Sequence, residues 1–120
     1  MQRSVVLVGA SGISVHLCRL LEEQHIKVKI IDQDKQKCQQ LAYRLTSSII
    51  LNHNATDLAF LKEECVQNCD VFVACTHSHE ANILAAVLAK QAGCEEVLSL
   101  VSKTSLTPLF TTTRDFVYTF

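Results

Sequence analysis

Residues 5–23, VVLVGASGISVHLCRLLEE, hold the pattern that decides the fold class. Val5 to Val8 is a short apolar run without polar alternation, which is typical of a strand buried on both faces of a parallel sheet. Two glycines then mark a turn, and apolar residues recur behind it at helical spacing. Those apolar residues are Ile13, Leu17, Leu20 and Leu21. The stretch therefore predicts a buried strand, a tight turn and a helix that packs through these four side chains.

The same alternation of strand and helix continues along the chain. Further runs rich in Val, Ile or Leu predict strands at residues 28–31, 49–51, 71–74 and 97–101. The helical patterns between them are Cys38, Leu41, Ala42 and Leu45 behind a cap at Asp34, a short helix at 57–64, and a longer helix at 79–92 with Gly93 as its C-cap. With right-handed crossovers, this order predicts an α/β fold, a Rossmann-like doubly wound parallel sheet in a single three-layer α/β/α domain.

The pattern weakens in the last part of the chain, after residue 101. Residues 106–110 predict one helical turn around Pro108, and residues 116–120 predict a last edge strand. We expect residues 1–120 to form a single nucleotide-binding domain and to be a fragment of a longer protein.

Composition excludes some classes of function. The 120 residues carry a net charge of −1 and no run of like charge, which argues against a nucleic-acid partner. No signal peptide is visible, and no apolar run approaches the ~20 residues of a membrane span. The six cysteines therefore predict free thiols in a reducing compartment, and we expect a cytoplasmic protein.

The glycine turn lies where a dinucleotide-binding fold carries G-x-G-x-x-G, a motif that lets backbone amides reach a phosphate. In one register the turn reads Gly9-x-Ser11-x-x-Ser14. In the other it reads Gly9-x-x-Gly12-x-x-Val15, which is similar to the short-chain dehydrogenase pattern. Either register predicts a phosphate site at the start of the first helix.

Asp32 ends the second predicted strand, 23 residues after Gly9. A carboxylate at this point accepts hydrogen bonds from a ribose diol and disfavours a 2′-phosphate, so the spacing favours NAD or an adenosine nucleotide over NADP. The other interpretation is that Asp32 only caps the turn before Asp34.

Five segments together carry a resemblance to a known family. They are VVLVGASGISVHLCRLLEE, VKIIDQD, ILNHNATDLAFLKEE, DVFVACTHSHEANILAAVLAKQAG and EEVLSLV, in this order between residues 4 and 110. They resemble the N-terminal lobe of RCK (KTN) domains and are most similar to the Trk-type potassium-uptake regulators. The segment from Asp70 to Asn82 is the most specific of the five.

The resemblance implies a cytosolic regulatory domain that binds NAD(H) or ATP/ADP and gates a potassium transporter or channel. It implies a membrane-embedded potassium transporter subunit as partner, hence a place at the inner face of the membrane, and a homo-dimer or higher oligomer. The phosphate would lie on the glycine turn, the ribose on Asp32, the base near Asn54, and Thr76 would face the same crevice. Glu80 would contact phosphate-bound cations. The full candidate set is Gly9, Ala10, Ser11, Gly12, Ile13, Ser14, Asp32, Gln33, Asn54, Ala55, Thr76, His77 and Glu80.

Three positions depart from the family pattern. Ser11 puts a Cβ where backbone approaches the pyrophosphate, although its hydroxyl could donate to a phosphate oxygen. Ser14 is a milder change, because a small side chain still lets the helix approach the strand. Asn54 stands in His53-Asn54-Ala55, where the family usually reads G-D-A, and it removes a charge while keeping an acceptor. Nucleotide binding would then be weak, directed to a different ligand, or lost.

Metal binding and catalysis find little support in the sequence. His77 and His79 with Cys75 make too few ligands for a closed zinc site, so we expect no metal. The Tyr-x-x-x-Lys pair of short-chain dehydrogenases is missing, since Tyr43 is followed four residues later by Ser47. We expect a protein without enzymatic activity. The alternatives are a degenerate Rossmann lobe that serves dimerisation or docking without a ligand, and a dinucleotide-binding fragment of a dehydrogenase.

Apolar side chains on the long helix and near the end of the chain could form a contact surface for a second copy. The apolar positions of the long helix are Ala81, Ile83, Leu84, Val87 and Leu88, and Phe110, Phe116 and Tyr118 follow. All of these side chains could pack against a second copy of the chain. For those on the helix, the alternative is an ordinary core that faces the sheet.

Overall fold

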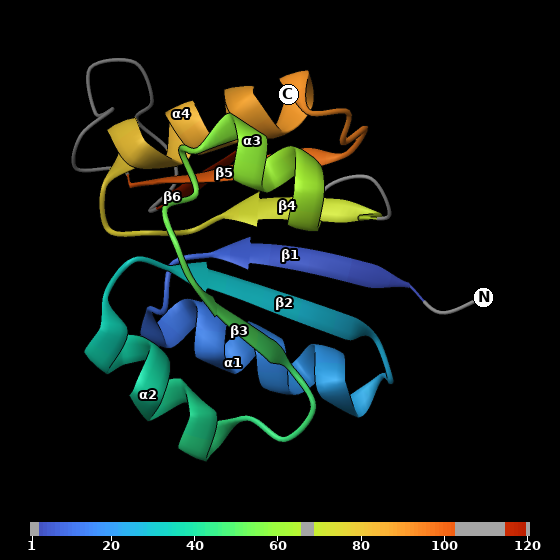
Figure 1. Ribbon diagram of the computed structural model, residues 1–120, viewed down its shortest axis with the longest axis vertical. Helices are drawn as coiled ribbons and strands as arrows, with labels where there is room; N and C mark the ends of the chain where they lie inside the picture. Colours follow the sequence, from blue (N-terminus) through green and yellow to red (C-terminus); the bar gives the residue numbers. More distant parts are fainter. Residues whose placement is uncertain (1–2, 66–68, 103–114, 120) are drawn as a thin grey trace.

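The computed structural model describes residues 3–65, 69–102 and 115–119, and every structural statement below concerns these residues. Strands and helices alternate through most of the chain (Figure 1). The elements are β1 Ser4–Val8, α1 Gly12–Glu23, β2 Lys27–Asp32, α2 Lys35–Arg44, β3 Ile49–Asn52, α3 Leu58–Phe60, the π-helical turn η1 Leu61–Cys65, β4 Val71–Ala74, α4 His79–Gln91, β5 Val97–Ser102 and β6 Asp115–Thr119. The predicted doubly wound α/β fold is confirmed.

One sheet contains all six strands in the order β3-β2-β1-β4-β5-β6. Strands β1 to β5 pair in parallel, whereas β6 pairs antiparallel with β5 at the edge. The chain runs outward from β1 to β3 and then returns to β4 beside β1. The carboxyl ends of β1 and β4 therefore border the switch point, where open α/β sheets bind their ligands.

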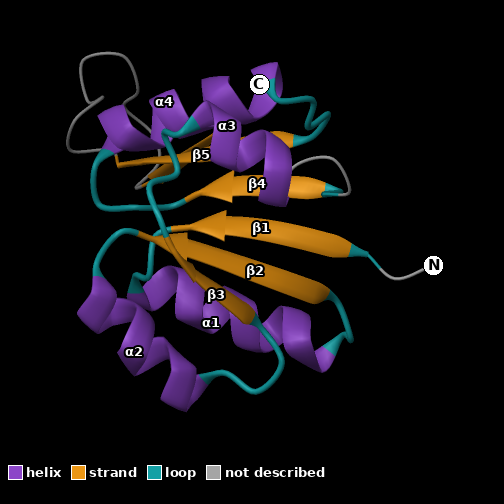
Figure 2. Cartoon of the chain, viewed as in Figure 1, coloured by secondary structure: helices purple, strands orange, loops and turns teal. Residues whose placement is uncertain are grey.

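Helices cover both faces of the sheet, as the three-layer prediction requires (Figure 2). Alternate residues of β1 point to opposite faces: Leu7 packs with α1 and α2, whereas Val6 and Val8 pack with η1 and α4. Helix α4 approaches the sheet closely because small residues face it, namely Ala85, Ala86 and Ala89. The two cores hold the strand ends in fixed positions around the switch point.

The predicted apolar face of α1 is partly wrong. Ile13 and Leu20 are 56% and 46% exposed, while Leu17 and Leu21 are half-buried. The residues that α1 buries are Ser14, Val15 and Cys18. The buried face lies around Ser14, which a hydrophobic pattern treats as polar although its hydroxyl is hydrogen-bonded inside the turn. In α2, similarly, Cys38 and Leu41 are buried but Ala42 is exposed.

Predictions at the helix ends and the edge strand are confirmed. Asp34 caps α2 through Gln36 and Lys37, and Gly93 adopts a φ of +112° just after α4. The predicted edge strand matches β6, but the turn at 106–110 lies outside the described residues. Cys18, Cys38, Cys69, Cys75 and Cys94 are free thiols. None of the helices described has the length and apolar character needed to cross a membrane.

Candidate functional site

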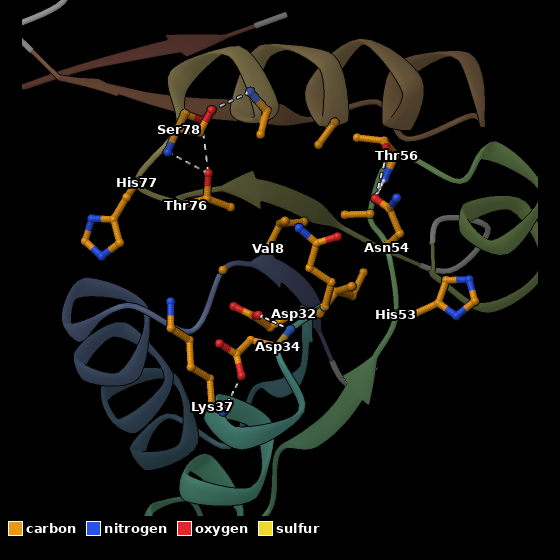
Figure 3. Close-up of a pocket in the computed structure, with 16 residues that line it drawn as sticks. Val8, Asp32, Asp34, Lys37, His53, Asn54, Thr56, Thr76, His77 and Ser78 are labelled. Atoms are coloured by element: carbon orange, nitrogen blue, oxygen red, sulfur yellow. Dashed lines mark hydrogen bonds between the residues drawn. The ribbon is translucent and has the colours of Figure 1, made fainter.

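A crevice of about 350 Å³ opens at the carboxyl ends of the parallel strands (Figure 3). Asp32, Asp34 and Lys37 lie on one side of it, and Thr76, His77 and Ser78 lie on the other. The remaining lining residues are Val8, Gly9, Ile31, Gln33, His53, Asn54, Ala55, Thr56, Ala81 and Ala85. The crevice combines an apolar floor with convergent polar groups, which is the usual make-up of a small-molecule site.

Gly9 has to be glycine in this turn. Its φ is +104°, which L side chains rarely adopt, and its N–H donates to the carbonyl of Ile31 at 2.9 Å. A Cβ on Gly9 would lie 2.9 Å from the backbone N and Cα of Thr76. The turns after β1 and β4 therefore touch at Gly9 and Thr76, so no side chain separates the two sides of the crevice there.

Ser11 and Ser14 each accept a hydrogen bond from the other's backbone N–H at the start of α1. The N–H of Ser11 donates to Ser14 Oγ at 2.8 Å, and the N–H of Ser14 donates to Ser11 Oγ at 3.3 Å. This reciprocal pair is a capping box, which satisfies two backbone donors without a ligand. The hydroxyl of Ser11 also donates to the carbonyl of Cys75 at 3.3 Å, and the side chain is buried. The Ser11 hydroxyl, expected to face a phosphate, is instead engaged inside the fold.

Two amides of the first turn of α1 stay open. Within the described part of the chain, the N–H groups of Gly12 and Ile13 have no hydrogen-bond acceptor, as expected for the start of a helix. They leave donors at the positive end of a twelve-residue helix. Ala10, Ser11 and Gly12 border a second hollow of about 70 Å³ beside Lys37 and Arg44.

Asp32 joins the ends of β1 and β2 and faces the crevice. Its Oδ2 accepts from the N–H of Ala10 at 2.7 Å, and its Oδ1 accepts from the N–H of Asp34 at 2.7 Å. The turn-capping role weighed from the sequence is therefore present. The carboxylate is only half-buried, and each oxygen keeps a second lone pair for another donor.

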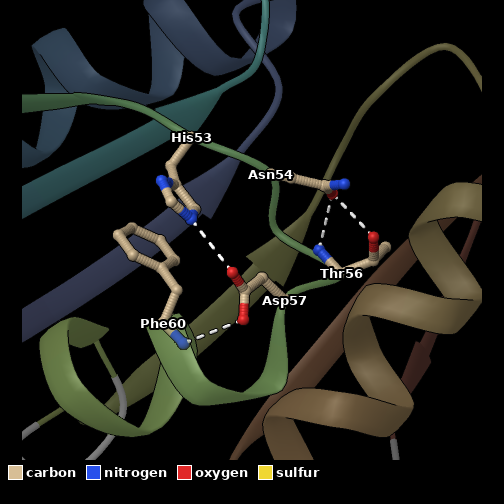
Figure 4. Close-up of polar contacts among 5 residues, drawn as sticks. All are labelled: His53, Asn54, Thr56, Asp57 and Phe60. Atoms are coloured by element: carbon tan, nitrogen blue, oxygen red, sulfur yellow. Dashed lines mark hydrogen bonds and ion pairs between the residues drawn. The ribbon is translucent and has the colours of Figure 1, made fainter.

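The loop after β3 forms one end of the crevice (Figure 3), and Figure 4 shows its polar contacts. Oδ1 of Asn54 accepts from the N–H of Thr56 at 2.9 Å and from its hydroxyl at 2.6 Å. The ring of His53 stacks on Phe60 at a centroid distance of 3.9 Å and contacts Asp57 Oδ2 at 3.2 Å. The hydrogen bond from His53 is the main reason why the pKa of Asp57 lies below its ordinary value.

A buried asparagine fixes the opposite side of the crevice. Oδ1 of Asn82 accepts from the N–H of Thr76 at 2.8 Å and from its hydroxyl at 2.6 Å, and Nδ2 donates to the Thr76 carbonyl at 3.1 Å. Next to it, burial raises the pKa of the Cys75 thiol to about 11. The side chain of Ser78 caps α4 through the N–H of Ala81 at 3.2 Å. This side is therefore a rigid turn rather than a loose loop.

The structure brings most of the candidate residues together. Those that line the crevice are Gly9, Asp32, Gln33, Asn54, Ala55, Thr76 and His77. Ala10, Ser11 and Gly12 line the second hollow, whereas Ser14 is buried beneath the turn and Ile13 and Glu80 line neither space. Residues that the sequence reasoning did not assign to the site are Lys37, His53, Thr56, Ser78 and Asn82. The signal for Lys37 was its place in the polar stretch DQDKQK, which begins at the last residue of β2.

No group of three or more His, Cys, Asp or Glu residues in the described ranges is arranged to hold a metal ion. The pair His77 and His79 stands at the start of α4, with His77 exposed and His79 half-buried.

Comparison with models of protein families identifies the family of this chain. The model of the TrkA-N domain matches residues 5–114, which is most of the sequence. The chain belongs to the TrkA-N domain family. This agrees with the resemblance carried by the five segments.

Curated relatives of this TrkA-N chain are similar over most of its length. It is 37% identical over 107 residues to the Trk system potassium uptake protein TrkA of Halomonas elongata, covering 89% of this chain and 23% of the relative. It is 34% identical over 107 residues to a TrkA homologue of Methanosarcina mazei, covering 88% of this chain and 26% of the relative. The chain thus spans about a quarter of the length of these relatives.

Solved structures with the same fold have low sequence identity. The NAD(P)-binding domain of an exopolyphosphatase-related protein from Archaeoglobus fulgidus matches with a TM-score of 0.74 at 18% identity, covering 89% of this chain and 79% of that one. The Bordetella bronchiseptica enzyme WbmG in complex with NAD and UDP matches with a TM-score of 0.63 at 14% identity, covering 79% and 36%. These matches establish the Rossmann-like fold of the TrkA-N chain.

Proposed function

We propose that this TrkA-N domain binds a nucleotide in the crevice and acts as the ligand-sensing regulatory domain of a potassium-uptake system. The observation that carries the proposal is the half-buried carboxylate of Asp32, which faces the crevice beside the start of α1. A carboxylate in this place accepts from the two hydroxyls of a ribose. NAD(H) and the adenine nucleotides ATP and ADP are the first ligands to test.

Each part of a nucleotide has a counterpart among the strand ends. The phosphates would leave the crevice for the start of α1, where the N–H groups of Gly12 and Ile13 are open and Gly12 lines the second hollow. The ribose would lie on Asp32, at the end of β2. The base would then reach the loop after β3, where Asn54, Ala55 and Thr56 line the crevice.

The regulatory part of the proposal rests on the relatives, which are named as potassium uptake proteins. A membrane-embedded transporter subunit would read a change in this domain, which would then lie in the cytoplasm at the inner face of the membrane. The response can be no larger than the difference in nucleotide affinity between the two states of the domain. Residues 1–120 would form a single sensing domain without enzymatic activity.

An exposed apolar face supports the expected self-association. On α4, the side chains of Ile83, Leu84 and Val87 are 39%, 49% and 37% exposed, while Ala81 and Leu88 are half-buried. A second copy that covers this face would bury several large apolar groups. The charge-introducing variant Leu84→Glu should then shift the molecular mass measured by light scattering to that of the monomer. Glu23→Lys is the control and should not shift it, because exposed Glu23 ends α1 on the other face of the sheet.

Thermal unfolding with ligands tests the sensor function. A ligand at a hundredfold excess over its Kd stabilises a folded protein by about 2.7 kcal/mol. We expect such a shift with at least one of NADH, NAD, ATP, ADP and AMP, and a loss of that shift in Asp32→Ala. Unchanged melting with all five at millimolar concentration would overturn the proposal.

A ligand-free lobe kept for association is the second candidate. The capping box of Ser11 and Ser14 favours it, because these hydroxyls already satisfy donors at the helix start. This candidate predicts no thermal shift with any nucleotide but a mass that still depends on Leu84.

A further inference from the structure

The segments that lead into β4 and β5 lie at the amino end of the sheet, opposite the crevice (Figure 1). Cys69 precedes β4 and Cys94 precedes β5, and these two strands are parallel neighbours. Each cysteine stands three residues before a member of the strand pair Phe72 and Val97, so the two cysteines occupy the same level of the sheet. Neighbouring strands lie about 4.8 Å apart, which is within the Cα separation of about 4.4–6.8 Å that a disulfide spans.

The side chains of Cys69 and Cys94 have the same local arrangement and contact each other. Sγ of Cys69 donates to the carbonyl of Val71 at 2.8 Å, and Sγ of Cys94 donates to the carbonyl of Glu96 at 3.4 Å. Sγ of Cys94 also lies 3.9 Å from the carbonyl oxygen of Cys69, and the two thiols are within hydrogen-bonding reach of each other. A bond between the two sulfurs therefore needs small rotations of the side chains and no movement of the strands.

The surroundings of the pair make Cys94 the more reactive thiol. The hydrogen bond from Cys69 is the main reason why the pKa of the Cys94 thiol falls to about 7 in spite of burial, and the charge of Lys90 acts in the same direction. The same contact, together with burial, raises the pKa of Cys69, which therefore keeps its proton. A thiolate beside a second thiol is the arrangement in which an oxidised sulfur is captured as a disulfide.

Three other thiols have the opposite character. Burial raises the pKa of Cys18 to about 12 and that of Cys75 to about 11, and it also raises the pKa of Cys38. Cys18 packs in the core on the other face of the sheet, and Cys75 follows the carboxyl end of β4. Because the thiolate is the form that reacts, these three cysteines should resist an oxidant that attacks Cys94.

We propose that Cys69 and Cys94 form a redox-sensitive dithiol, which a hydroperoxide converts into an intrachain disulfide. The Cys94 thiolate attacks one oxygen of hydrogen peroxide, the O–O bond breaks, and a sulfenic acid and hydroxide form. The sulfur of Cys69 then attacks the sulfenic sulfur and the S–O bond breaks, and the departing hydroxide takes the Cys69 proton and leaves as water. The first hydroxide is neutralised by the proton that Cys94 released on ionisation. The two sulfurs thus lose two electrons, and the peroxide is reduced to two molecules of water.

The disulfide would join two positions that are 25 residues apart in the chain. The closed loop contains β4, α4 and the turn that carries Thr76 on one side of the crevice. A crosslink restricts the unfolded chain, so the oxidised domain should resist unfolding more than the reduced one. In a reducing compartment such a bond is transient, since thiols reverse it by exchange. This modification does not depend on nucleotide binding.

Oxidation of the reduced 120-residue chain with a modest excess of hydrogen peroxide provides the test. After denaturation and alkylation, peptide mapping by mass spectrometry should find Cys69 linked to Cys94, and two of the six thiols should no longer react with Ellman's reagent. The midpoint of thermal unfolding should rise by at least about 5 °C. Dithiothreitol should reverse all three changes.

Serine variants show which cysteines are responsible. Cys69→Ser and Cys94→Ser should each abolish the linked peptide and the thermal shift, whereas the control Cys65→Ser, in η1, should keep both. The linked peptide is measured on the chain with its own sequence, so a variant that fails to fold leaves the test intact. Peroxide that leaves all thiols free, that oxidises Cys94 to a sulfinic acid without a disulfide, or that links a different pair would overturn the inference. The proposed nucleotide binding would stand in each of these cases.

Discussion

The carboxylate of Asp32 accepts a hydrogen bond from the backbone N–H of Ala10 at 2.7 Å, which ties the end of β2 to the turn after β1. The second carboxylate oxygen accepts from the N–H of Asp34 at 2.7 Å. One side chain thus shapes two neighbouring turns and also faces the crevice. A change at Asp32 should affect stability even without a ligand.

We therefore expect Asp32→Ala to lower the free energy of unfolding by about 2 kcal/mol, because two backbone donors lose a charged acceptor. Urea denaturation followed by circular dichroism measures this loss. The exposed neighbour offers a control, since Gln33→Ala should change the stability by less than about 0.5 kcal/mol. Equal stability of Asp32→Ala and the unmodified chain would show that the two turns hold their shape without the carboxylate.

The contact between Gly9 and Thr76 gives a second prediction. Gly9→Ala should lower the free energy of unfolding by at least about 2 kcal/mol, because the new methyl group meets backbone at 2.9 Å and φ is +104°. Gly12→Ala is the matched control, since a Cβ there meets nothing within 4 Å. Thermal denaturation of the two variants should separate them clearly, and similar melting temperatures would contradict the close contact.

Ser11 and Ser14 should behave as a coupled pair. Each single replacement by alanine should cost about 1 kcal/mol, the usual loss when a cap is removed. The double variant should cost less than the sum by about 0.5 kcal/mol or more, because the two side chains bond reciprocally. A double-mutant cycle measures this coupling by chemical denaturation, and strict additivity would speak against the capping box.

Glu22 gives a prediction about pH. Its Oε2 accepts from the N–H groups of Ser47 and Ser48 at 2.8 and 2.9 Å, in the loop before β3. Partial burial pushes the pKa of Glu22 upward, but these hydrogen bonds outweigh it and hold the pKa below its ordinary value. The lowered pKa means that the folded state favours the carboxylate, so its contribution to stability is complete above about pH 4.3 and disappears as the pH falls through the folded pKa.

The variant Glu22→Gln should accordingly be less stable than the unmodified chain at pH 7, by about 1 kcal/mol. The difference should shrink as the pH falls below about 4. Unfolding curves from pH 7 down to pH 3 measure it, with the exposed Glu23→Gln as reference. A difference that stays constant across this range would exclude the carboxylate as its source.

The sequence predicted the strands and helices well because each is built from local patterns. Apolar runs, the cap at Asp34 and the glycine after α4 all act within a few residues, and the structure has them where expected. The antiparallel direction of β6 could not be predicted, because it depends on a pairing with β5 that no local pattern encodes.

The candidate site was predictable in outline and less so in detail. Gly9, Asp32 and Thr76 lie at strand ends, so the topology alone brings them to one crevice. The inward turn of Ser11 was not predictable, because its hydroxyl finds a partner in Cys75, 64 residues away. Asn82 was missed for another reason. Its partner Thr76 is only six residues away, but the contact joins a helix to the end of a strand and has no spacing rule that would reveal it.

The serine pair at the start of α1 also affects how ordered this turn is when no ligand is bound. In a bare glycine-rich turn a bound anion supplies the acceptors that the first amides lack, whereas here two of those amides are already satisfied by side chains. A ligand would therefore add less order to this turn than it adds to an uncapped one, and amide hydrogen exchange there should be slow even in its absence. Because less conformational entropy is then lost on binding, a ligand would meet a preorganised turn instead of having to order a loose one.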